Sequence, residues 1–343
     1  MIRPFLNAAV LSLSLAPALA GAAMADEKPV LHVYTYDSFV AEWGPGPAVE
    51  KAFEAICACD LKFTATGDGA ALLARLQLEG ARSDADIVLG LDTGLTARAA
   101  ATGLFAAHGR TPIVDIPNPH GEAGSWDDPL FLPYDWGYFA FVYDRARLQE
   151  VPQSFEALIA APKNLKIIIQ DPRSSTPGLG LLYWVKAAYG DRAPEIWAGL
   201  QPHVLTVTKG WSEAYGLFLE GEADMVLSYT TSPAYHLIAE SDDTKAAAVF
   251  DEGHYMQIEV AAMLAGSDQP DLAGQFLDFM LSDAFQSVIP ETNWMYPAIT
   301  PDGGLPEGFA NPVSPDRALL LTPDQALALR DEALQEWLAA LSR

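Results

Sequence analysis

The chain has 343 residues, half of them apolar, and a formal net charge of −25 at pH 7. This length suits one large domain or two of ordinary size, and a charged fraction of only 19% argues against long disordered stretches. The acidic balance argues against nucleic acid as a partner, since phosphate binding needs clustered lysines and arginines, and against an anionic membrane surface.

Residues 1–25 have the pattern of a secretory signal peptide. Arg3 supplies a positive charge, NAAVLSLSLAPALA supplies an apolar segment, and AMA before Asp26 is a small-residue cleavage pattern. Cleavage after Ala20 is the alternative. No Cys stands at the cleavage site to carry a lipid anchor, and no later apolar run approaches the length of a spanning helix. We therefore expect an exported, soluble protein from which residues 1–25 are removed.

From Val30 onward, strand-like and helix-like segments alternate in two series. The strand-like segments are residues 30–36, 61–66 and 85–91 in the first series and 165–170, 204–208 and 224–229 in the second. The helix-like segments are residues 47–56 and 69–80 in the first series and 177–190, 211–221 and 232–240 in the second. Alternation on this scale is typical of α/β folds with largely parallel sheets.

Two long extended segments, residues 131–148 and 254–266, stand outside both series. The simplest topology is two α/β lobes joined by these segments as two crossing strands. Helices at 271–282 and 283–289 then return to the first lobe, and an amphipathic helix at 323–341 packs on the surface. The predicted boundaries are 26–137 and 255–343 for lobe 1 and 138–254 for lobe 2.

The two cysteines, Cys57 and Cys59, are separated by one residue. An oxidising exported compartment favours a disulfide, but in a regular strand the two side chains would point to opposite faces, so both redox states stay open. No His or Cys follows at the spacing of a zinc site. We expect no metal at this pair.

Hydroxyl and carboxylate residues stand where predicted strands end and helices begin. Asp68 precedes one helix, Ser175 and Thr176 precede Pro177 in a second, and TTSP at residues 230–233 opens a third. Each could be a plain helix cap. Each could also belong to an anion site, because free backbone N–H groups, hydroxyls and the helix dipole together suit a phosphate. Asp68 could equally accept hydrogen bonds from a ligand amino group.

Aromatic residues lie close to the same turns. They include Tyr34, Tyr36, Trp43, Trp211, Tyr229 and Trp294. Core packing is the simplest role for any one of them, but Trp211 and Tyr229 both fall where a strand ends. Aromatic faces near a cleft stack on flat rings and attract cations. Together with the phosphate cradle and the carboxylate, they suggest a flat, cationic ligand that can carry phosphate.

Long motifs in this chain resemble the thiamine-binding periplasmic proteins of bacterial ABC importers. The motifs are YTYDSF, WGPGP, ADIVLGLD, GYFAFVYD, QDPRSSTPGLGLL, VTKGWSEAYGLFL, VLSYTTSPAYH, EGHY and NWMYP. The resemblance runs from Pro29 to Arg343 and departs from the family only in the local segment PHGEAGSWDDP. It implies a two-lobed periplasmic-binding fold of type II that closes on thiamine, thiamine monophosphate or thiamine diphosphate. It also implies delivery to a membrane permease driven by an ATPase.

The family's ligand contacts carry over where the motifs match. The matching residues are Asp68, Gly69, Ser175, Thr176, Trp211, Tyr229, Thr230, Thr231 and Ser232. On chemistry and position we add Tyr36 and Trp294. The expected roles are stacking for Trp211 and Tyr229, contact with the aminopyrimidine for Asp68, and phosphate contact for Ser175 and Thr176. We expect a periplasmic monomer without a cofactor, a metal or a catalytic residue.

Two other functions remain as alternatives. A protein of the same fold could carry another cargo, such as a polyamine or ferric ion. A secreted thiaminase-type enzyme would need a Cys nucleophile with a nearby base in the cleft, and Cys57 and Cys59 stand between a helix and a strand, away from the expected cleft.

Overall fold

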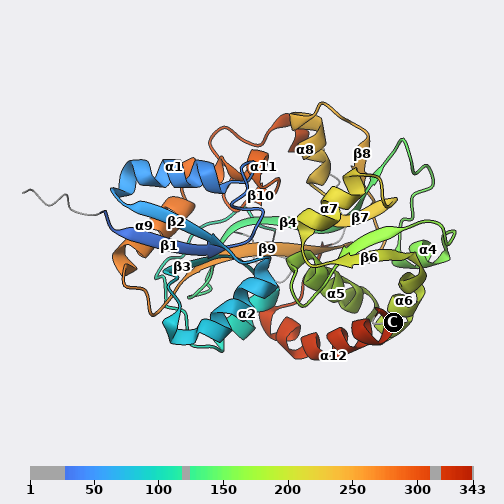
Figure 1. Ribbon diagram of the computed structural model, residues 1–343, viewed down its shortest axis with the longest axis horizontal. Helices are drawn as coiled ribbons and strands as arrows, with labels where there is room; N and C mark the ends of the chain where they lie inside the picture. Colours follow the sequence, from blue (N-terminus) through green and yellow to red (C-terminus); the bar gives the residue numbers. More distant parts are fainter. Residues whose placement is uncertain (1–27, 118–123, 310–317, 342–343) are drawn as a thin grey trace, which may run out of the picture.

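The computed structural model describes residues 28–117, 124–309 and 318–341. The predicted signal peptide lies outside the described residues, as do residues 119–123 of the segment PHGEAGSWDDP. The chain forms two groups of strands and helices that lie side by side (Figure 1). In the described part of the chain, no helix combines the length and the apolar composition needed to cross a membrane.

Lobe 1 is built on three parallel strands with helices on both faces. The strands are β1 (Val30–Thr35), β2 (Asp60–Ala65) and β3 (Ile87–Asp92), with β1 between the other two. The helices are α1 (Gly46–Cys57), α2 (Gly69–Glu79), α3 (Thr93–Ala100), α9 (Pro270–Met280), α10 (Asp283–Gln286) and α11 (Ile289–Thr292). One core holds Phe53 of α1 against Phe276 of α9, and a second core holds the buried leucines of α2 and α3. The chain thus returns to lobe 1 after the second series, as predicted.

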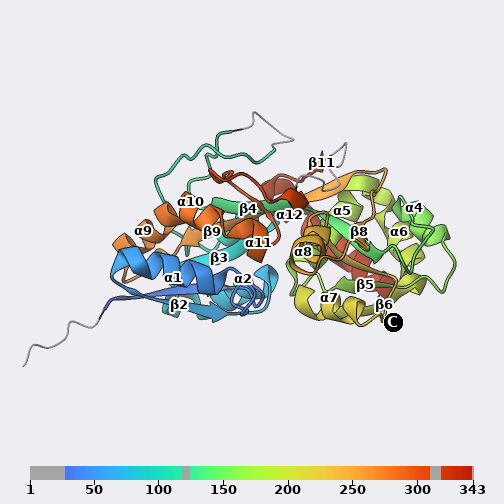
Figure 2. The same ribbon diagram turned by 90° about the horizontal axis from the view of Figure 1, so that it is seen from above.

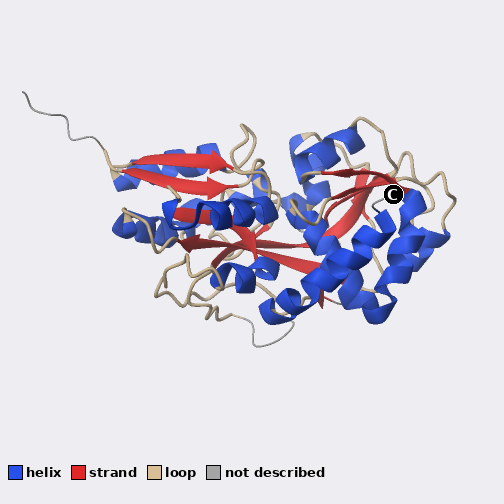
Figure 3. Cartoon of the chain, turned by 60° about the horizontal axis from the view of Figure 1, so that its bottom comes forward, coloured by secondary structure: helices blue, strands red, loops and turns tan. Residues whose placement is uncertain are grey.

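Lobe 2 repeats this plan. Its strands are β5 (Ile167–Gln170), β6 (Val204–Thr208) and β7 (Met225–Tyr229), with β5 parallel to both neighbours. Its helices are α4 (Phe155–Ala160), α5 (Thr176–Tyr189), α6 (Ala193–Leu200), α7 (Trp211–Leu219) and α8 (Ser232–Ala239). Helices α5 and α6 pack in the large core, whereas α7 packs on a separate small cluster. Figure 3 shows the strands of each lobe flanked by helices.

Two long strands cross between the lobes. They are β4 (Leu132–Asp144) and β9 (His254–Met263), which run antiparallel to each other. The first part of β4 pairs with β9, and from Phe139 onward β4 pairs with β7. The strand order is therefore β2-β1-β3-β9-β4-β7-β5-β6, which passes continuously through both lobes (Figures 1 and 2). This topology confirms the predicted two-lobed α/β fold with two crossing strands.

Short strands complete the sheets. They are β8 (Lys245–Ala247), β10 (Tyr296–Pro297) and β11 (Ala318–Leu319), of which β8 and β10 pair with β4 and β11 pairs with β9. The C-terminal helix α12 (Pro323–Leu341) packs against α3 of lobe 1 and against α5 and α6 of lobe 2. It therefore braces both lobes on one side of the crossing strands. The exact lobe boundaries given above stay a prediction.

Cys57 and Cys59 form a disulfide at the junction of α1 and β2. The intervening Ala58 adopts a left-handed backbone conformation with φ of 53°, which turns the chain sharply after the helix. The turn brings together two side chains that a regular strand would hold on opposite faces. The question that the sequence leaves open is therefore answered in favour of the oxidised pair.

The lobes touch where α2 begins on one side and α5 begins on the other. The Ser175 hydroxyl donates a hydrogen bond of 2.7 Å to Asp68 Oδ2, and the Trp211 amide donates one of 3.3 Å to the same oxygen. The Gly69 amide donates to Thr176 Oγ1 at 3.1 Å. A methyl group on Gly69 would lie 2.7 Å from that Thr176 oxygen, so this approach requires glycine. These contacts hold the lobes in a closed arrangement.

We predict that Asp68→Ala opens the ligand-free protein. The variant loses both hydrogen bonds to the Asp68 carboxylate, and a hydrogen bond to a charged group contributes roughly 1.5–3 kcal/mol. Small-angle X-ray scattering should give a larger radius of gyration than for the unmodified protein. Asp60→Ala, at an exposed carboxylate of β2 that forms an ion pair with Lys62, is the matched control and should leave the scattering unchanged. Identical scattering from both variants would contradict the closing role.

Candidate functional site

A cavity of about 570 Å³ lies between the lobes, within the size range of small-molecule sites. Its lining residues are Tyr36, Ser38, Trp43, Asp68, Thr176, Pro177, Trp211, Ser212, Tyr215, Gly216, Leu219, Tyr229, Ser232, Tyr235, Ala239, Glu259, Glu291, Asn293, Trp294 and Met295. Most of them follow the carboxyl ends of parallel strands in one lobe or the other. The site therefore occupies the position at which open α/β sheets bind ligands.

A stack of aromatic rings forms the wall on the side of lobe 2. Trp211 and Tyr215, one helical turn apart on α7, stack with ring centroids 5.0 Å apart and an interplanar angle of 24°. The Trp211 indole N–H donates a hydrogen bond of 2.8 Å to Ser228 Oγ, which fixes the ring position. Tyr229 lines the cavity at the end of β7, and its hydroxyl donates to Gln257 at 2.8 Å. These rings are held in place before any ligand arrives.

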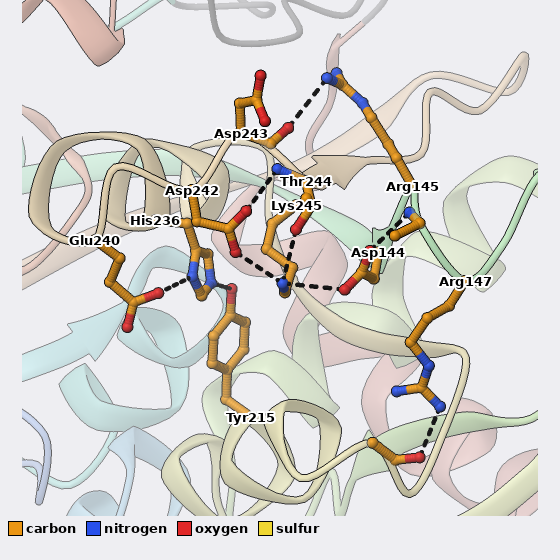
Figure 4. Close-up of polar contacts among 12 residues, drawn as sticks. Asp144, Arg145, Arg147, Tyr215, His236, Glu240, Asp242, Asp243, Thr244 and Lys245 are labelled. Atoms are coloured by element: carbon orange, nitrogen blue, oxygen red, sulfur yellow. Dashed lines mark hydrogen bonds and ion pairs between the residues drawn. The ribbon is translucent and has the colours of Figure 1, made fainter.

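A polar chain behind this wall fixes the second ring of the stack (Figure 4). The Tyr215 hydroxyl lies 2.9 Å from His236 Nε2, and His236 Nδ1 lies 2.7 Å from Glu240. Because a carboxylate only accepts, His236 Nδ1 is the donor to Glu240. Farther along, Lys245 bridges Asp144 and Asp242 at 3.1 and 3.0 Å. The network ties α7 to α8 and to the edge strand β8.

Aromatic residues also meet across the lobes at the rim. Trp43 of lobe 1 lies 6.2 Å from Trp211, and Trp294 of lobe 1 lies 5.2 Å from Tyr235 of α8, both measured between ring centroids. Trp294 has a φ of 56°, a left-handed conformation that strains a residue with a large side chain. Its amide donates to the Ile289 carbonyl, so the tight turn after α11 holds the ring over the cavity.

Three carboxylates line the cavity: Asp68, Glu259 and Glu291. No Lys, Arg or His is among the residues that line it in the described part of the chain. Burial raises the pKa of Asp68 to about 6, although the hydrogen bonds from Ser175 and Trp211 oppose the rise. Negative charge in a partly desolvated cavity with no cationic side chain in its lining favours a positively charged guest.

The residues predicted as ligand contacts divide into two groups. Those that line the cavity are Tyr36, Asp68, Thr176, Trp211, Tyr229, Ser232 and Trp294. Those that lie outside the lining are Gly69, Ser175, Thr230 and Thr231. Ser175 is fully buried and bonded to Asp68, and the two threonines are buried at the start of α8 with hydroxyl oxygens that have no hydrogen-bond partner within the described residues. As ligand contacts, all of these residues stay predictions.

Sequence reasoning missed several lining residues. Tyr215 stands four positions after Trp211 on the same helical face, and Tyr235 stands three positions after Ser232, so helical spacing could have found both. Glu259 is an isolated acidic residue in the apolar strand β9, which is itself a signal of a functional carboxylate. Asn293 and Met295 belong to the motif NWMYP, but nothing in that motif marks either residue as a ligand contact.

Comparison with known proteins places this site in a family. The family model of bacterial extracellular solute-binding proteins matches residues 44–287. The thiamine-binding periplasmic protein of Escherichia coli (strain K12) is 55% identical, covering 92% of this chain and 94% of that protein. The one from Salmonella typhimurium is 54% identical, covering 94% and 96%.

Solved structures agree at the level of the fold. A structure described as a periplasmic thiamin binding protein has a TM-score of 0.87 and 54% identity, covering 92% of this chain and 97% of that one. Iron-bound HitA from Pseudomonas aeruginosa has a TM-score of 0.70 at 21% identity, which shows the fold alone. The family consists of solute-binding proteins, in agreement with the prediction of a binding protein rather than an enzyme. This chain belongs to the bacterial extracellular solute-binding proteins and, among them, to the thiamine-binding periplasmic proteins.

Proposed function

We propose that this chain binds thiamine and its mono- and diphosphate in the cavity between the lobes and delivers them to the permease of an ABC importer. The observation that carries the proposal is the lining of the cavity, which combines aromatic rings with carboxylates and contains no Lys, Arg or His among the described residues. Thiamine joins two flat aromatic rings, an aminopyrimidine and a thiazolium with a permanent positive charge. Relatives that are 54–55% identical bear the name of thiamine-binding proteins.

The aromatic wall suits the thiazolium ring. Trp211 follows β6 and Tyr229 ends β7, on either side of β5, and both line the cavity. From lobe 1, Trp43 lies beside Trp211 and Trp294 lies beside Tyr235. A desolvated cation–π contact contributes about 2 kcal/mol, so even one well-placed ring gives a thiazolium a large advantage over an uncharged ring. The same wall explains why a compact metal ion is a poor match for this cavity.

Asp68 is the candidate partner of the aminopyrimidine. Its Oδ2 accepts the two hydrogen bonds from lobe 2, whereas Oδ1 accepts none from the described residues. An amino group of the ligand can donate to Oδ1 without breaking the contacts that close the lobes. Ligand binding and lobe closure then use the two oxygens of one carboxylate, which makes each favour the other.

Helix N-termini are the candidate phosphate site. Thr176 and Pro177 of α5, Trp211 and Ser212 of α7, and Ser232 of α8 all line the cavity at the first turn of a helix. Backbone N–H groups and the helix dipole stabilise an anion there without a lysine or arginine. Asp68 already accepts from Ser175 before α5 and from the Trp211 amide at the start of α7, so a phosphate tail would use the other amides of these first turns.

The setting of this function is export and transport. We propose that residues 1–25 are a signal peptide cleaved after Ala25, that the mature chain acts as a periplasmic monomer, and that a permease and an ATPase receive its cargo. Names of the relatives as periplasmic proteins support this setting. Mass spectrometry of the exported chain would test the cleavage site, because its mass identifies the first residue.

Trp211→Ala should weaken thiamine binding roughly 30-fold, the equivalent of about 2 kcal/mol of cation–π and stacking energy. Isothermal titration calorimetry measures the change. Trp126→Ala is the control, since Trp126 is partly exposed and lies outside this cavity. Equal affinity in the Trp211 variant, with its fold verified by thermal melting, would reject the stacking role.

The double variant Ser175→Ala, Thr176→Ala should lose more affinity for thiamine monophosphate than for thiamine. The two hydroxyls also hold the lobes together, so some loss for both ligands is expected. Asp68→Asn perturbs the Ser175 contact while keeping both hydroxyls, and it serves as the comparison. If the double variant lost equal affinity for both ligands, the assignment of this helix to phosphate would fail.

A further inference from the structure

Two carboxyl groups face each other beneath the cavity. Asp135 on β4 and Glu259 on β9 are partners in the antiparallel register of the crossing strands. Glu259 lines the cavity with 6% of its surface exposed, and Asp135 lies behind it with none. The pair therefore sits at the point where both lobes and the ligand space meet.

The hydrogen bonds around the pair distinguish its two members. Glu259 Oε2 accepts from the Tyr36 hydroxyl at 3.0 Å and from the Tyr134 hydroxyl at 2.8 Å. Asp135 Oδ2 accepts from Asn293 Nδ2 at 2.5 Å, but the buried Asp135 Oδ1 has no partner among the described residues. Two hydroxyl donors stabilise Glu259 as an anion. The unpartnered oxygen of Asp135 is the natural place for a proton.

The described residues around the pair supply no compensating positive charge. The titratable groups that face the pair come from every element around it: Tyr36 after β1, Asp68 after β2, Asp92 of β3, Tyr134 of β4, Tyr229 of β7 and Glu291 of α11. None of these is cationic. Burial and then the Glu259 charge raise the pKa of Asp135 well above its usual value, and burial raises that of Glu259 despite its hydrogen bonds.

We propose that the Asp135–Glu259 pair shares one proton in the empty protein and releases it when a cationic ligand enters the cavity. This inference rests on the proposed function and names the counter-ion of the bound cation. On binding, the O–H bond of Asp135 breaks, the proton leaves to solvent, and the pair passes from one negative charge to two. The positive charge of the ligand replaces the positive charge of the lost proton.

The coupling between ligand binding and proton release determines whether the affinity for thiamine increases or decreases with pH. A cation near the pair favours its fully ionised form, so the bound state has the lower pKa and binding releases protons. The affinity for thiamine then increases with pH, by up to about tenfold per unit while a full proton is released. The increase stops above the pKa of the empty pair, where no proton remains to be lost.

Calorimetry of thiamine binding in two buffers of different ionisation enthalpy, at one pH near neutrality, counts the released protons. We expect the unmodified protein to release close to one proton, and Asp135→Asn and Glu259→Gln to release almost none. Any proton exchanged by thiamine itself is common to all proteins and cancels in the comparison. Thermal melting verifies that each variant is folded. If a variant does not fold, the proton count measured on the unmodified protein still tests the proposal.

Asp92→Asn is the matched control, because Asp92 is a buried carboxyl outside the cavity lining and burial raises its pKa to about 7. It should still release the proton. Loss of release in this control, with release retained in Asp135→Asn, would overturn the proposal and assign the proton elsewhere. Tight binding without release in the unmodified protein would also overturn it. Absence of thiamine binding altogether would instead refute the proposed function.

Discussion

Uncompensated negative charge in an aromatic cavity is the constraint on which the site depends. Glu259 and Asp68 reach the cavity, Asp135 lies directly behind Glu259, and no Lys, Arg or His is found among the described residues of the lining. Burying an ionised carboxylate without a cationic partner costs free energy, so such a group either binds a proton or attracts a cation. The rings of Trp211 and Tyr229 add a second attraction for positive charge. A guest that is flat and cationic meets both requirements.

The fold makes this arrangement possible because it brings distant strand ends together. Strands β4 and β9 pass from one lobe to the other, which places Asp135 and Glu259 at the junction. The parallel strands of each lobe end toward the same space and deliver Asp68 from one side and Trp211 from the other. Helix α12 packs against α3 of lobe 1 and against α5 and α6 of lobe 2. Asp68 lines the cavity and also forms the contacts between the lobes, so under the proposed function binding and closing share this residue.

Much of the fold could be predicted from periodicity and turn chemistry. The buried run of β3 and the helices α5 and α7 appear within two residues of their expected ends, because their patterns are long or sharply bounded. The short helices α3, α4 and α6 were missed, since a helix of six to eight residues shows too little periodicity to separate it from a loop. The crossing strands were recognisable because they are long and lie outside both βα series.

Only those residues of the site that lie in turns directly after predicted strands could be predicted from the sequence. The turns at Asp68 and Trp211 follow predicted strands, and both residues line the cavity. The bond from Ser175 to Asp68 spans 107 positions, and no local pattern announces it. Glu259 lies within an apolar strand, where alternation does not say which face opens to a ligand.

The most direct test of the central claim compares thiamine with an uncharged analogue of the same shape, in which a neutral aromatic thiophene ring replaces the thiazolium ring. Calorimetry at one pH gives both affinities. If the cavity selects positive charge, the analogue should bind at least about tenfold more weakly, a difference of about 1.4 kcal/mol. Equal affinity for the two compounds would show that shape alone fills the cavity and would contradict the electrostatic basis of the site.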